Sequence, residues 1–290
     1  MTRRNWLWQT AALTGGAAAT RARAEEVPCL GTLPATEKLL ASYTLWPQSN
    51  SGLRQVYTYG RGPAIIILHE LPGLSPEDLA YGLRVADRGG FTVYLPLLFG
   101  GAGQNSAALG SLQACLSGKF ACCSPSKTSR ITGSLRTLCR AVSIQHHGAG
   151  IGVIGLCLTG SLPLALLTEP CVKAVVCCEP SLPLLGHKSD LGISRDESKA
   201  AQNRVDVPIL VYRFRNDTIS THERFEAIRK LVGSRFGGSE LPNVEQHSAK
   251  SHADHAVMTH SYSDCENSPT RRAFDAVISY LRLQLISPNT

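Results

Sequence analysis

The sequence has few aromatic residues and no apolar run long enough to cross a membrane. Aromatic side chains make up 6% of its 290 residues, and a membrane-spanning helix needs about 20 consecutive apolar residues. Lysine and arginine give a net charge of +7, but they are scattered and form no basic block with interleaved aromatic residues. Such a block is typical of nucleic-acid binding. We therefore expect neither a membrane span nor a nucleic-acid partner.

The ten cysteines lack the spacing of metal ligands. No two of them are separated by two residues, as zinc ribbons require. Cys177 and Cys178 end an apolar run, so we expect them to be buried in a strand. The stretch His252-Ala253-Asp254-His255 resembles half of a metallo-hydrolase signature, but Lys250 stands where its first histidine would be. We therefore predict no metal and no cofactor, and the zinc content of the purified protein would test the alternative.

Residues 1–24 resemble a twin-arginine export signal. Arg3 and Arg4 precede a mildly apolar stretch rich in Ala, Gly and Thr, and Ala22-Arg23-Ala24 supplies a cleavage site of the small-x-small type. We predict export to the periplasm, and the alternative is a cytoplasmic protein with a disordered leader. In an exported chain some of the other cysteines could be oxidised after export.

The rest of the chain alternates between strand-like and helix-like patterns. After an irregular lead-in over residues 25–53, strands are predicted at 54–59 (an edge strand), 64–69, 91–95, 151–155, 174–178, 207–214 and 244–247. Helices are predicted at 76–89, 131–144, 161–167, within 184–206, at 221–231 and at 269–285. This alternation favours one doubly wound, mostly parallel sheet with helices on both faces. We expect residues 54–290 to form a single α/β domain and the protein to be a monomer.

The segment Gly155-Leu156-Cys157-Leu158-Thr159-Gly160 follows an apolar strand-like run and precedes a helix-like one. A sharp strand-to-helix turn with a nucleophile between two glycines is a nucleophile elbow. The residue at its tip is strained, its neighbours must be small, and the dipole of the following helix favours a thiolate and an oxyanion. The alternative is a structural cysteine beside a tight turn.

Other polar residues are expected at the same edge of the sheet. Ligands bind outside the carboxyl ends of the strands in such folds, where the sequence places Glu70, Cys157 and Asp217. A thiol nucleophile needs a base, and the base needs an acid that orients it. In the elbow-bearing folds these follow in the order nucleophile, acid, histidine. Cys157, Asp217 and one of His252, His255 and His260 keep this order.

Four segments in this order resemble the dienelactone hydrolase family, a branch of the α/β-hydrolases that uses a cysteine nucleophile. They are His69–Gly73, Gly155–Gly160, the turn at Asp217, and Ala253–Thr259. The segment Pro269–Asp275 also resembles a branch of the family, and the resemblance covers residues 64–285. It implies an α/β-hydrolase fold and an enzyme that cleaves a carboxylic ester or lactone, similar to a carboxymethylenebutenolidase.

The resemblance also implies a role for each matching residue. Cys157 would be the nucleophile, His255 its base and Asp217 the acid that orients the base. Glu70 would interact with the resting thiol, because a carboxylate beside a thiol keeps it unreactive until substrate arrives. The backbone N–H groups of Leu71 and Leu158 would form the oxyanion hole, where each such donor lowers the barrier by roughly 3 kcal/mol.

The sequence departs from the family where the dienelactone-cleaving members bind the substrate carboxylate with arginines. One of these arginines would be at Thr259, and the other would lie within Pro96–Gly103, which contains none. Arg213 and Arg215 are possible substitutes, or they are surface charges. The natural substrate is therefore left open. A non-catalytic or redox-sensing binding module on the same scaffold is the alternative function, and turnover of an ester would discriminate between the two.

Overall fold

The computed structural model describes residues 33–47, 52–71, 73–103, 129–181, 187–243 and 254–286. The expected export signal at residues 1–24 and the strand predicted at 244–247 lie outside the described residues. Within them, no helix is both long and apolar enough to cross a membrane.

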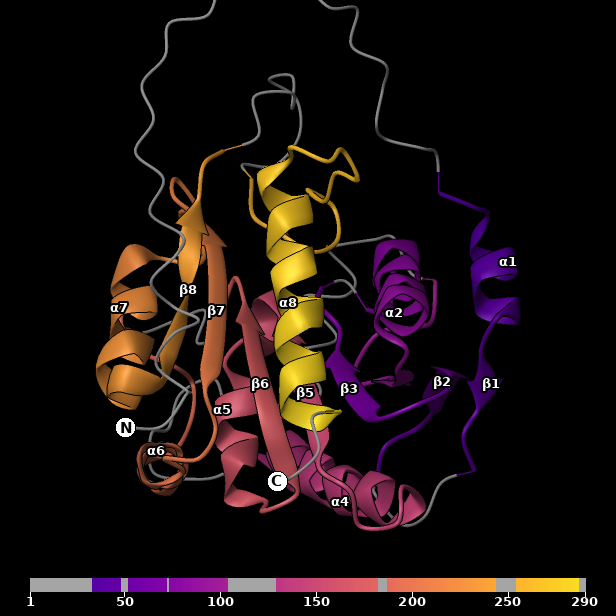
Figure 1. Cartoon of the computed structure of the whole chain (residues 1–290), viewed down its shortest axis with the longest axis horizontal. Coiled ribbons are helices and arrows are strands. Elements are labelled where there is room, and N and C mark those ends of the chain that lie inside the picture. Colours follow the sequence, from indigo (N-terminus) through magenta and orange to yellow (C-terminus); the bar gives the residue numbers. More distant parts are fainter. Residues whose placement is uncertain are drawn as a thin grey trace, which may run out of the picture.

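An eight-stranded sheet forms the centre of the molecule, with the strand order β1-β2-β4-β3-β5-β6-β7-β8 (Figure 1). Strands β3 to β8 run parallel, and β1 and β2 are added antiparallel at one edge. The strands are β1 Thr44–Leu45, β2 Val56–Gly60, β3 Ala64–Leu68, β4 Thr92–Pro96, β5 Ile151–Leu156, β6 Val172–Cys178, β7 Ile209–Phe214 and β8 Phe236–Leu241. The predicted mostly parallel sheet is confirmed.

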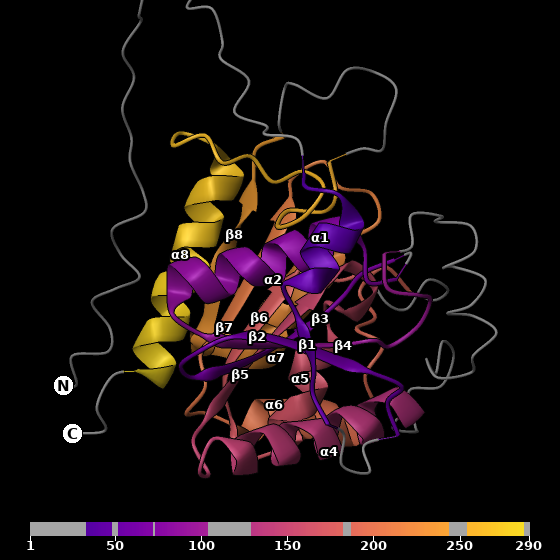
Figure 2. The same ribbon diagram turned by 90° about the vertical axis from the view of Figure 1, so that its right-hand side faces the viewer.

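Helices cover both faces of the sheet. The α-helices are α1 Thr36–Ala41, α2 Pro76–Gly89, α4 Arg130–Gln145, α5 Leu162–Ala165, α6 Arg195–Asn203, α7 His222–Val232 and α8 Pro269–Leu285, and short 3-10 turns are η2 Cys157–Thr159, η3 Leu166–Thr168 and η4 Gly233–Arg235. Residues of α1, α2 and α8 form one apolar core with the sheet, and residues of α4, α5, α6 and α7 form the other. Figure 2 shows α2 and α8 on one side of the strands and α4 on the other.

The apolar run that forms β3 is buried on both faces, as its β-branched composition predicts. Ile65 and Ile67 belong to the core under α2 and α8, whereas Ile66 and Leu68 belong to the core under α4. No residue of this strand is more than 1% exposed. The alternation follows from the period of two along a strand, which sends successive side chains to opposite faces.

The carboxyl ends of the central strands lie level with one another. Leu68 at the end of β3 pairs with Gly155 of β5, Leu156 pairs with Cys178 at the end of β6, and Cys178 pairs with Tyr212 of β7. The residues that follow these strands are therefore neighbours in space, although up to about 150 residues separate them along the chain.

Several elements differ from the sequence prediction. The lead-in expected to be irregular contains α1 and β1, and β1 pairs with β2, so β2 is not the edge strand. Strand β8 was not predicted, because Gly237 and Gly238 lower its β-propensity. Gly238 is required there, since a Cβ would lie 1.9 Å from the Val211 carbonyl oxygen and φ is +130°.

The helix predicted after the elbow is also shorter than expected. Instead of a helix over 161–167, the chain forms the 3-10 turn η2, the four-residue helix α5 and the 3-10 turn η3. Pro163 has no amide hydrogen with which to extend the ladder of the preceding turn. The macrodipole at the elbow is therefore that of a short segment, and individual N–H groups matter more than the axis of a long helix.

Candidate active site

Cys157 lies at the tip of the turn between β5 and η2 with a φ of +48°, a conformation that is uncommon for residues other than glycine. The flanking glycines are required by close contacts. A Cβ on Gly155 would lie 2.4 Å from the Thr159 carbonyl oxygen, and one on Gly160 would lie 2.6 Å from the Cys178 carbonyl oxygen. The turn therefore fits only if both positions lack a side chain, and it holds the Cys157 side chain at the strand ends.

Thr159 fastens this turn to the neighbouring strand. Its hydroxyl lies 2.7 Å from the Leu68 carbonyl oxygen at the end of β3, and it accepts a hydrogen bond from the Leu156 amide at 3.0 Å. The side chain is fully buried. A buried hydroxyl with both a donor and an acceptor contact costs little to bury and fixes the distance between the two strand ends.

Asp217 occupies the turn after β7 and is oriented by that turn. Its Oδ1 atom accepts hydrogen bonds from the Ile219 amide at 2.8 Å and the Ser220 amide at 3.0 Å. Its Oδ2 atom is thereby left to face His255, whose Nδ1 lies 2.6 Å away. The Asp217 side chain is 1% exposed and that of His255 is 13% exposed. The short contact in a nearly dry environment makes this a strong, charge-assisted hydrogen bond.

The other ring nitrogen of His255 faces the elbow. Nε2 lies 3.3 Å from Ser181 Oγ, and the Cys157 side chain is near enough for its charge to act on the pKa of the imidazole. Burial acts to lower the pKa of His255, but the charge of Cys157 and the hydrogen bond with Asp217 outweigh it and hold the pKa well above its ordinary value. The arrangement favours a protonated His255 beside the Cys157 side chain.

The consecutive residues Val257, Met258 and Thr259, which follow His255 closely, are held by side chains from three different parts of the fold. The amide of Val257 donates to Glu179 Oε2 at 3.1 Å, the carbonyl oxygen of Met258 accepts from Arg84 Nη2 at 3.0 Å, and the hydroxyl of Thr259 hydrogen-bonds Glu70 Oε1. These partners come from the end of β6, from α2 and from the end of β3. The position of the histidine is therefore set by contacts across the whole site.

Glu70 is a buried carboxyl group that belongs to this cluster. Burial, then the charges of Asp78 and Cys157, raise the pKa of Glu70 well above its ordinary value. Asp78 is itself buried in the capping box of α2, where it accepts hydrogen bonds from the Ser75 amide and hydroxyl. Burial raises the pKa of Asp78 to about 7. Glu70 and Asp78 are thus two buried acids that lie near each other, and this arrangement favours a protonated Glu70 at neutral pH.

The two expected oxyanion donors belong to the turns that follow two adjacent strands, β5 and β3. Leu158 is in the first turn of η2, directly after Cys157, where N–H groups have no partner within the turn. Leu71 is half-buried and follows Glu70 in the turn after β3. Because Leu68 and Gly155 pair in the sheet, the two turns start from adjacent strand ends.

The structure brings together Cys157, Asp217, His255 and Glu70, the four predicted side chains, at the ends of β5, β7 and β3 and in the segment before α8. Of the two other candidate histidines, His260 is half exposed and lies 3.7 Å from Glu77, away from this cluster. His252 lies outside the described residues.

The sequence suggested that Arg213 either binds a substrate carboxylate or is a surface charge, and the structure supports neither role. It is 1% exposed and is therefore not a surface charge. Its Nε donates to the Ser220 carbonyl oxygen at 2.6 Å, its Nη2 donates to the Asp217 carbonyl oxygen at 2.8 Å, and its Nη1 contacts Glu240. These contacts occupy the guanidinium, so it is not available to bind a substrate carboxylate. Arg215 is exposed, as a surface charge would be.

Sequence reasoning missed two residues of the site, Glu179 and Ser181, in the turn after β6. Ser181 donates from its amide to the Cys157 carbonyl oxygen at 3.0 Å and from its hydroxyl to the Glu179 carbonyl oxygen at 2.7 Å. Glu179 is fully buried and has a φ of +36°. The signal in the sequence was a carboxylate directly after a predicted buried strand, the same signal that singled out Glu70.

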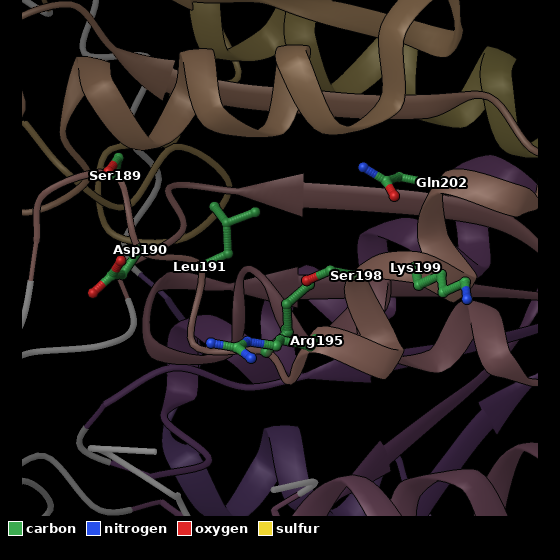
Figure 3. A pocket seen from close by; sticks show the side chains of 8 residues that line it. Ser189, Asp190, Leu191, Arg195, Ser198, Lys199 and Gln202 are labelled. Carbon is green, nitrogen blue, oxygen red and sulfur yellow. The ribbon is translucent and has the colours of Figure 1, made fainter. Parts of the chain in front are cut away.

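A separate hollow of about 490 Å³ lies beside α6 (Figure 3). It is lined by Ser189, Asp190, Leu191, Ile193, Arg195, Ser198, Lys199 and Gln202. None of these residues belongs to the cluster around Cys157. Among the residues that the structure describes, no group of three or more His, Cys, Asp and Glu could hold a metal ion.

The sheet and its two layers of helices have the α/β-hydrolase fold. The family model of the dienelactone hydrolase family matches residues 54–282, and the chain belongs to that family. A comparison with curated proteins found no match.

Three solved structures illustrate the similarity of fold. The dienelactone hydrolase-like promiscuous phosphotriesterase P91 from metagenomic libraries is 17% identical, with a TM-score of 0.60 and coverage of 84% of this chain and 98% of that one. A dienelactone hydrolase from Anabaena variabilis is 13% identical, with a TM-score of 0.54 and coverage of 84% and 99%. The esterase domain of a Rhodothermus marinus protein is 16% identical, with a TM-score of 0.54 and coverage of 83% and 97%.

Proposed function

We propose that this protein is a cysteine hydrolase that cleaves carboxylic esters or lactones through an acyl-Cys157 intermediate. The observation that carries the proposal is the position of His255 between Asp217, 2.6 Å from its Nδ1, and the Cys157 thiol. A base held in one tautomer by a buried acid and facing a nucleophile on a strained turn is the arrangement that acyl transfer needs. Membership of the dienelactone hydrolase family supports the same reaction class.

The reaction would proceed in two halves. The Cys157 thiolate attacks the carbonyl carbon, and the N–H groups of Leu71 and Leu158 stabilise the oxyanion. The carbon–oxygen bond breaks as the His255 imidazolium gives its proton to the leaving alkoxide, which leaves an acyl-Cys157. Water then attacks the thioester while His255 takes one of its protons, and the carbon–sulfur bond breaks to release the acid. Asp217 keeps the imidazole oriented in both halves.

The substrate that fits these residues is an ester or lactone without a carboxylate beside the reacting carbonyl. Thr259 stands where the family's carboxylate-binding arginine would be, and its hydroxyl is engaged by Glu70. Arg213 is committed to the Asp217 turn. An anionic substrate group would face the buried acids Glu70 and Asp78, and neither of the two family positions supplies an arginine to neutralise it, which is costly in a site of low dielectric.

We also propose that the chain is exported before it acts. The twin-arginine pattern of residues 1–24 is the main support. Cys265 is disulfide-bonded, and disulfides persist in oxidising compartments such as the periplasm. Fractionation of the natural host, followed by N-terminal sequencing of the protein from each fraction, tests this. Recovery of the uncleaved chain from the cytoplasm alone would count against export.

The activity is tested by incubating the purified protein with a neutral activated aryl ester and recording turnover together with intact mass. We expect turnover and a transient acyl adduct for the wild type, and neither for Cys157→Ala. Cys171→Ala is the matched control, because Cys171 is another free cysteine that lies outside the cluster. It should keep both turnover and adduct.

A charged analogue of the same ester tests the substrate class. We expect an ester with a carboxylate next to the reacting carbonyl to be cleaved at least about tenfold more slowly, because its charge is buried unpaired. No turnover and no adduct in the wild type, with the Cys157 thiol still open to alkylation, would refute the hydrolase proposal. Equal rates for the two esters would refute only the substrate class.

A further inference from the structure

Glu179 is a fully buried carboxyl group to which the proposed reaction gives no task. It follows β6 directly, between the strand that leads to Cys157 and the strand that leads to Asp217. Its φ of +36° is uncommon for a residue with a side chain and is further disfavoured by the following Pro180. Backbone strain of this kind persists where the surroundings hold it, and it is frequent at functional sites.

Two hydrogen bonds hold the strained backbone of Glu179 in place. The Glu179 amide donates to the Tyr212 carbonyl oxygen at 2.7 Å, and the Glu179 carbonyl oxygen accepts from the Ser181 hydroxyl at 2.7 Å. The same turn packs against the elbow so closely that a Cβ on Gly160 would lie 2.6 Å from the Cα of Pro180. The strain therefore directs the Glu179 side chain into the space between the strand ends and the His255 segment.

The side chain makes one contact that bears on the reaction. Glu179 Oε2 accepts a hydrogen bond from the Val257 amide at 3.1 Å, two residues after His255. Its Oε1 atom has no hydrogen-bond partner among the described residues. A buried carboxylate with a single hydrogen-bond donor would leave its charge largely uncompensated, whereas a protonated carboxyl group carries no charge and costs less to bury.

The charges around Glu179 favour the protonated form. Burial, then the charge of Glu70, raise the pKa of Glu179 well above its ordinary value of 4.5, and the charge of Asp217 acts in the same direction. His255 and the Val257 amide act to lower it but are outweighed. The other titratable groups that interact with Glu179 are Tyr81 of α2 and Cys178 of β6, and both are buried.

We propose that Glu179 is a positioning residue of this active site, a neutral buried carboxyl group that fixes the His255 segment through the Val257 amide. Only the expected loss of kcat rests on the proposed hydrolase function, whereas the positioning of the His255 segment does not. The contact acts through the backbone next to the histidine and does not touch the reacting atoms. A shift of His255 by a fraction of an ångström would weaken both its contact with Cys157 and that with Asp217, and such misplacement is costly in rate.

Three variants separate this role from others. Glu179→Gln keeps an acceptor of the same shape and no charge, and Glu179→Ala removes the acceptor. Glu169→Ala is the matched control, because Glu169 is also a buried glutamate and precedes β6 at the opposite end of the same strand. For each variant, kcat and KM are measured per alkylatable Cys157, together with the rate of Cys157 alkylation by iodoacetamide as a function of pH.

We expect Glu179→Ala to lower kcat by about 30-fold or more with KM within about threefold, and to slow Cys157 alkylation near neutral pH. Glu179→Gln should recover most of both rates, and Glu169→Ala should lower stability while leaving kcat per site near that of the wild type. Wild-type kcat in Glu179→Ala would overturn the proposal. Equal damage in the Gln and Ala variants would show that a negative charge is needed and would overturn the neutral acceptor.

Alkylation reads the position of His255 without ester turnover, so it separates this proposal from the hydrolase proposal. Where no ester is cleaved, a slowed alkylation of Cys157 in Glu179→Ala, recovered in Glu179→Gln, would still support the positioning role. An unchanged alkylation profile in all variants would refute it whatever the reaction is.

A stability measurement tests the neutral state even where Glu179→Ala does not fold. An acid with a raised pKa takes up a proton on folding when the pH lies between its ordinary pKa and its pKa in the folded protein. The stability that it confers at low pH is therefore lost as the pH rises towards the folded pKa. The folding equilibrium constant of the wild type should therefore fall about tenfold per pH unit relative to Glu179→Gln, starting near about pH 5. A difference between the two proteins that does not change with pH would overturn the proposal.

Discussion

The main-chain oxygen of Asp217 accepts a hydrogen bond from Arg213 Nη2 at 2.8 Å, while the side chain of Asp217 contacts His255 at 2.6 Å. One buried guanidinium thus holds the backbone of the residue that orients the histidine. Arg213 also bonds the Ser220 carbonyl oxygen and Glu240. Its planar fork satisfies both ends of the turn after β7, which a lysine could not do with a single ammonium group.

We expect Arg213→Met to destabilise the protein by about 3 kcal/mol, because two buried carbonyl oxygens and Glu240 lose their donor. The displaced Asp217 should lower kcat/KM by about 100-fold. Urea unfolding and ester kinetics measure the two effects. Arg215→Met is the matched control: this neighbouring arginine is exposed, so its variant should stay within about 0.5 kcal/mol of the wild type. Similar losses in both variants would contradict the assignment.

Thr259 gives a second prediction, because its hydroxyl contacts the buried Glu70 carboxyl and acts to lower the pKa of Glu70. Thr259→Val keeps the volume but removes this donor, so the pKa of Glu70 should rise further. We expect kcat/KM to fall about tenfold, the value of one hydrogen bond to a polar group in a buried site. Thr259→Ser should retain most of the activity. A Val variant with wild-type kinetics would show that the contact has no bearing on the reaction.

The fold and three of the site residues, Glu70, Cys157 and Asp217, could be predicted from local patterns, whereas only the family resemblance distinguished His255 from the other candidate histidines. The unbroken apolar run of β3, the capping box at Ser75 and the glycines around Cys157 each act over a few residues. The order of strand ends then placed Glu70 and Asp217 beside the elbow. These features are set by sterics and hydrogen bonding that neighbours along the chain determine.

The remaining features depend on contacts between distant segments. Glu179 and Val257 are 78 residues apart, and Thr259 and Glu70 are 189 residues apart. Glu179-Pro180-Ser181 has the composition of a surface turn, yet the carboxyl group is fully buried and accepts from the Val257 amide of the distant His255 segment. Arg213 stands in an apolar strand, and the sequence alone does not show that its guanidinium hydrogen-bonds two carbonyl oxygens in the turn after β7 and contacts Glu240 in β8.

The close approach at Gly160 predicts a strong effect of a single methyl group. A Cβ at this position would lie 2.6 Å from the Cys178 carbonyl oxygen and 3.0 Å from the Cys157 carbonyl oxygen. Because these are backbone atoms that cannot move aside, Gly160→Ala should destabilise the protein by about 2 kcal/mol or more and shift the elbow. Thermal unfolding and ester kinetics measure this.

Gly133 provides the control, since it lies in α4 with no heavy atom within 4 Å of a Cβ built on it. Gly133→Ala should stabilise the protein by about 0.5–1 kcal/mol through helix propensity alone and leave kcat unchanged. If Gly160→Ala behaved like Gly133→Ala, the close packing of the elbow against the turn after β6 would be contradicted.

His69 gives a prediction for acid stability. Its Nε2 accepts a hydrogen bond from the Leu98 amide at 3.0 Å, and its Nδ1 lies 2.9 Å from the Glu70 carbonyl oxygen, so the neutral ring with a proton on Nδ1 satisfies both contacts. Burial lowers the pKa of His69 from 6.5 to about 4. Below pH 6.5 the unfolded chain binds a proton here that the folded protein does not, so the stability conferred above this pH is lost as the pH falls towards 4.

We expect the wild type to lose roughly 3 kcal/mol from this group between about pH 7 and about pH 4. His69→Gln removes the titration and should show a correspondingly smaller loss, measured as the free energy of unfolding in urea at both pH values. His260→Gln is the control, because its side chain is half exposed, and it should follow the wild type. If all three proteins lost the same free energy on acidification, the pKa of His69 would not be lowered in the folded protein, and the buried neutral ring that accepts from the Leu98 amide would be contradicted.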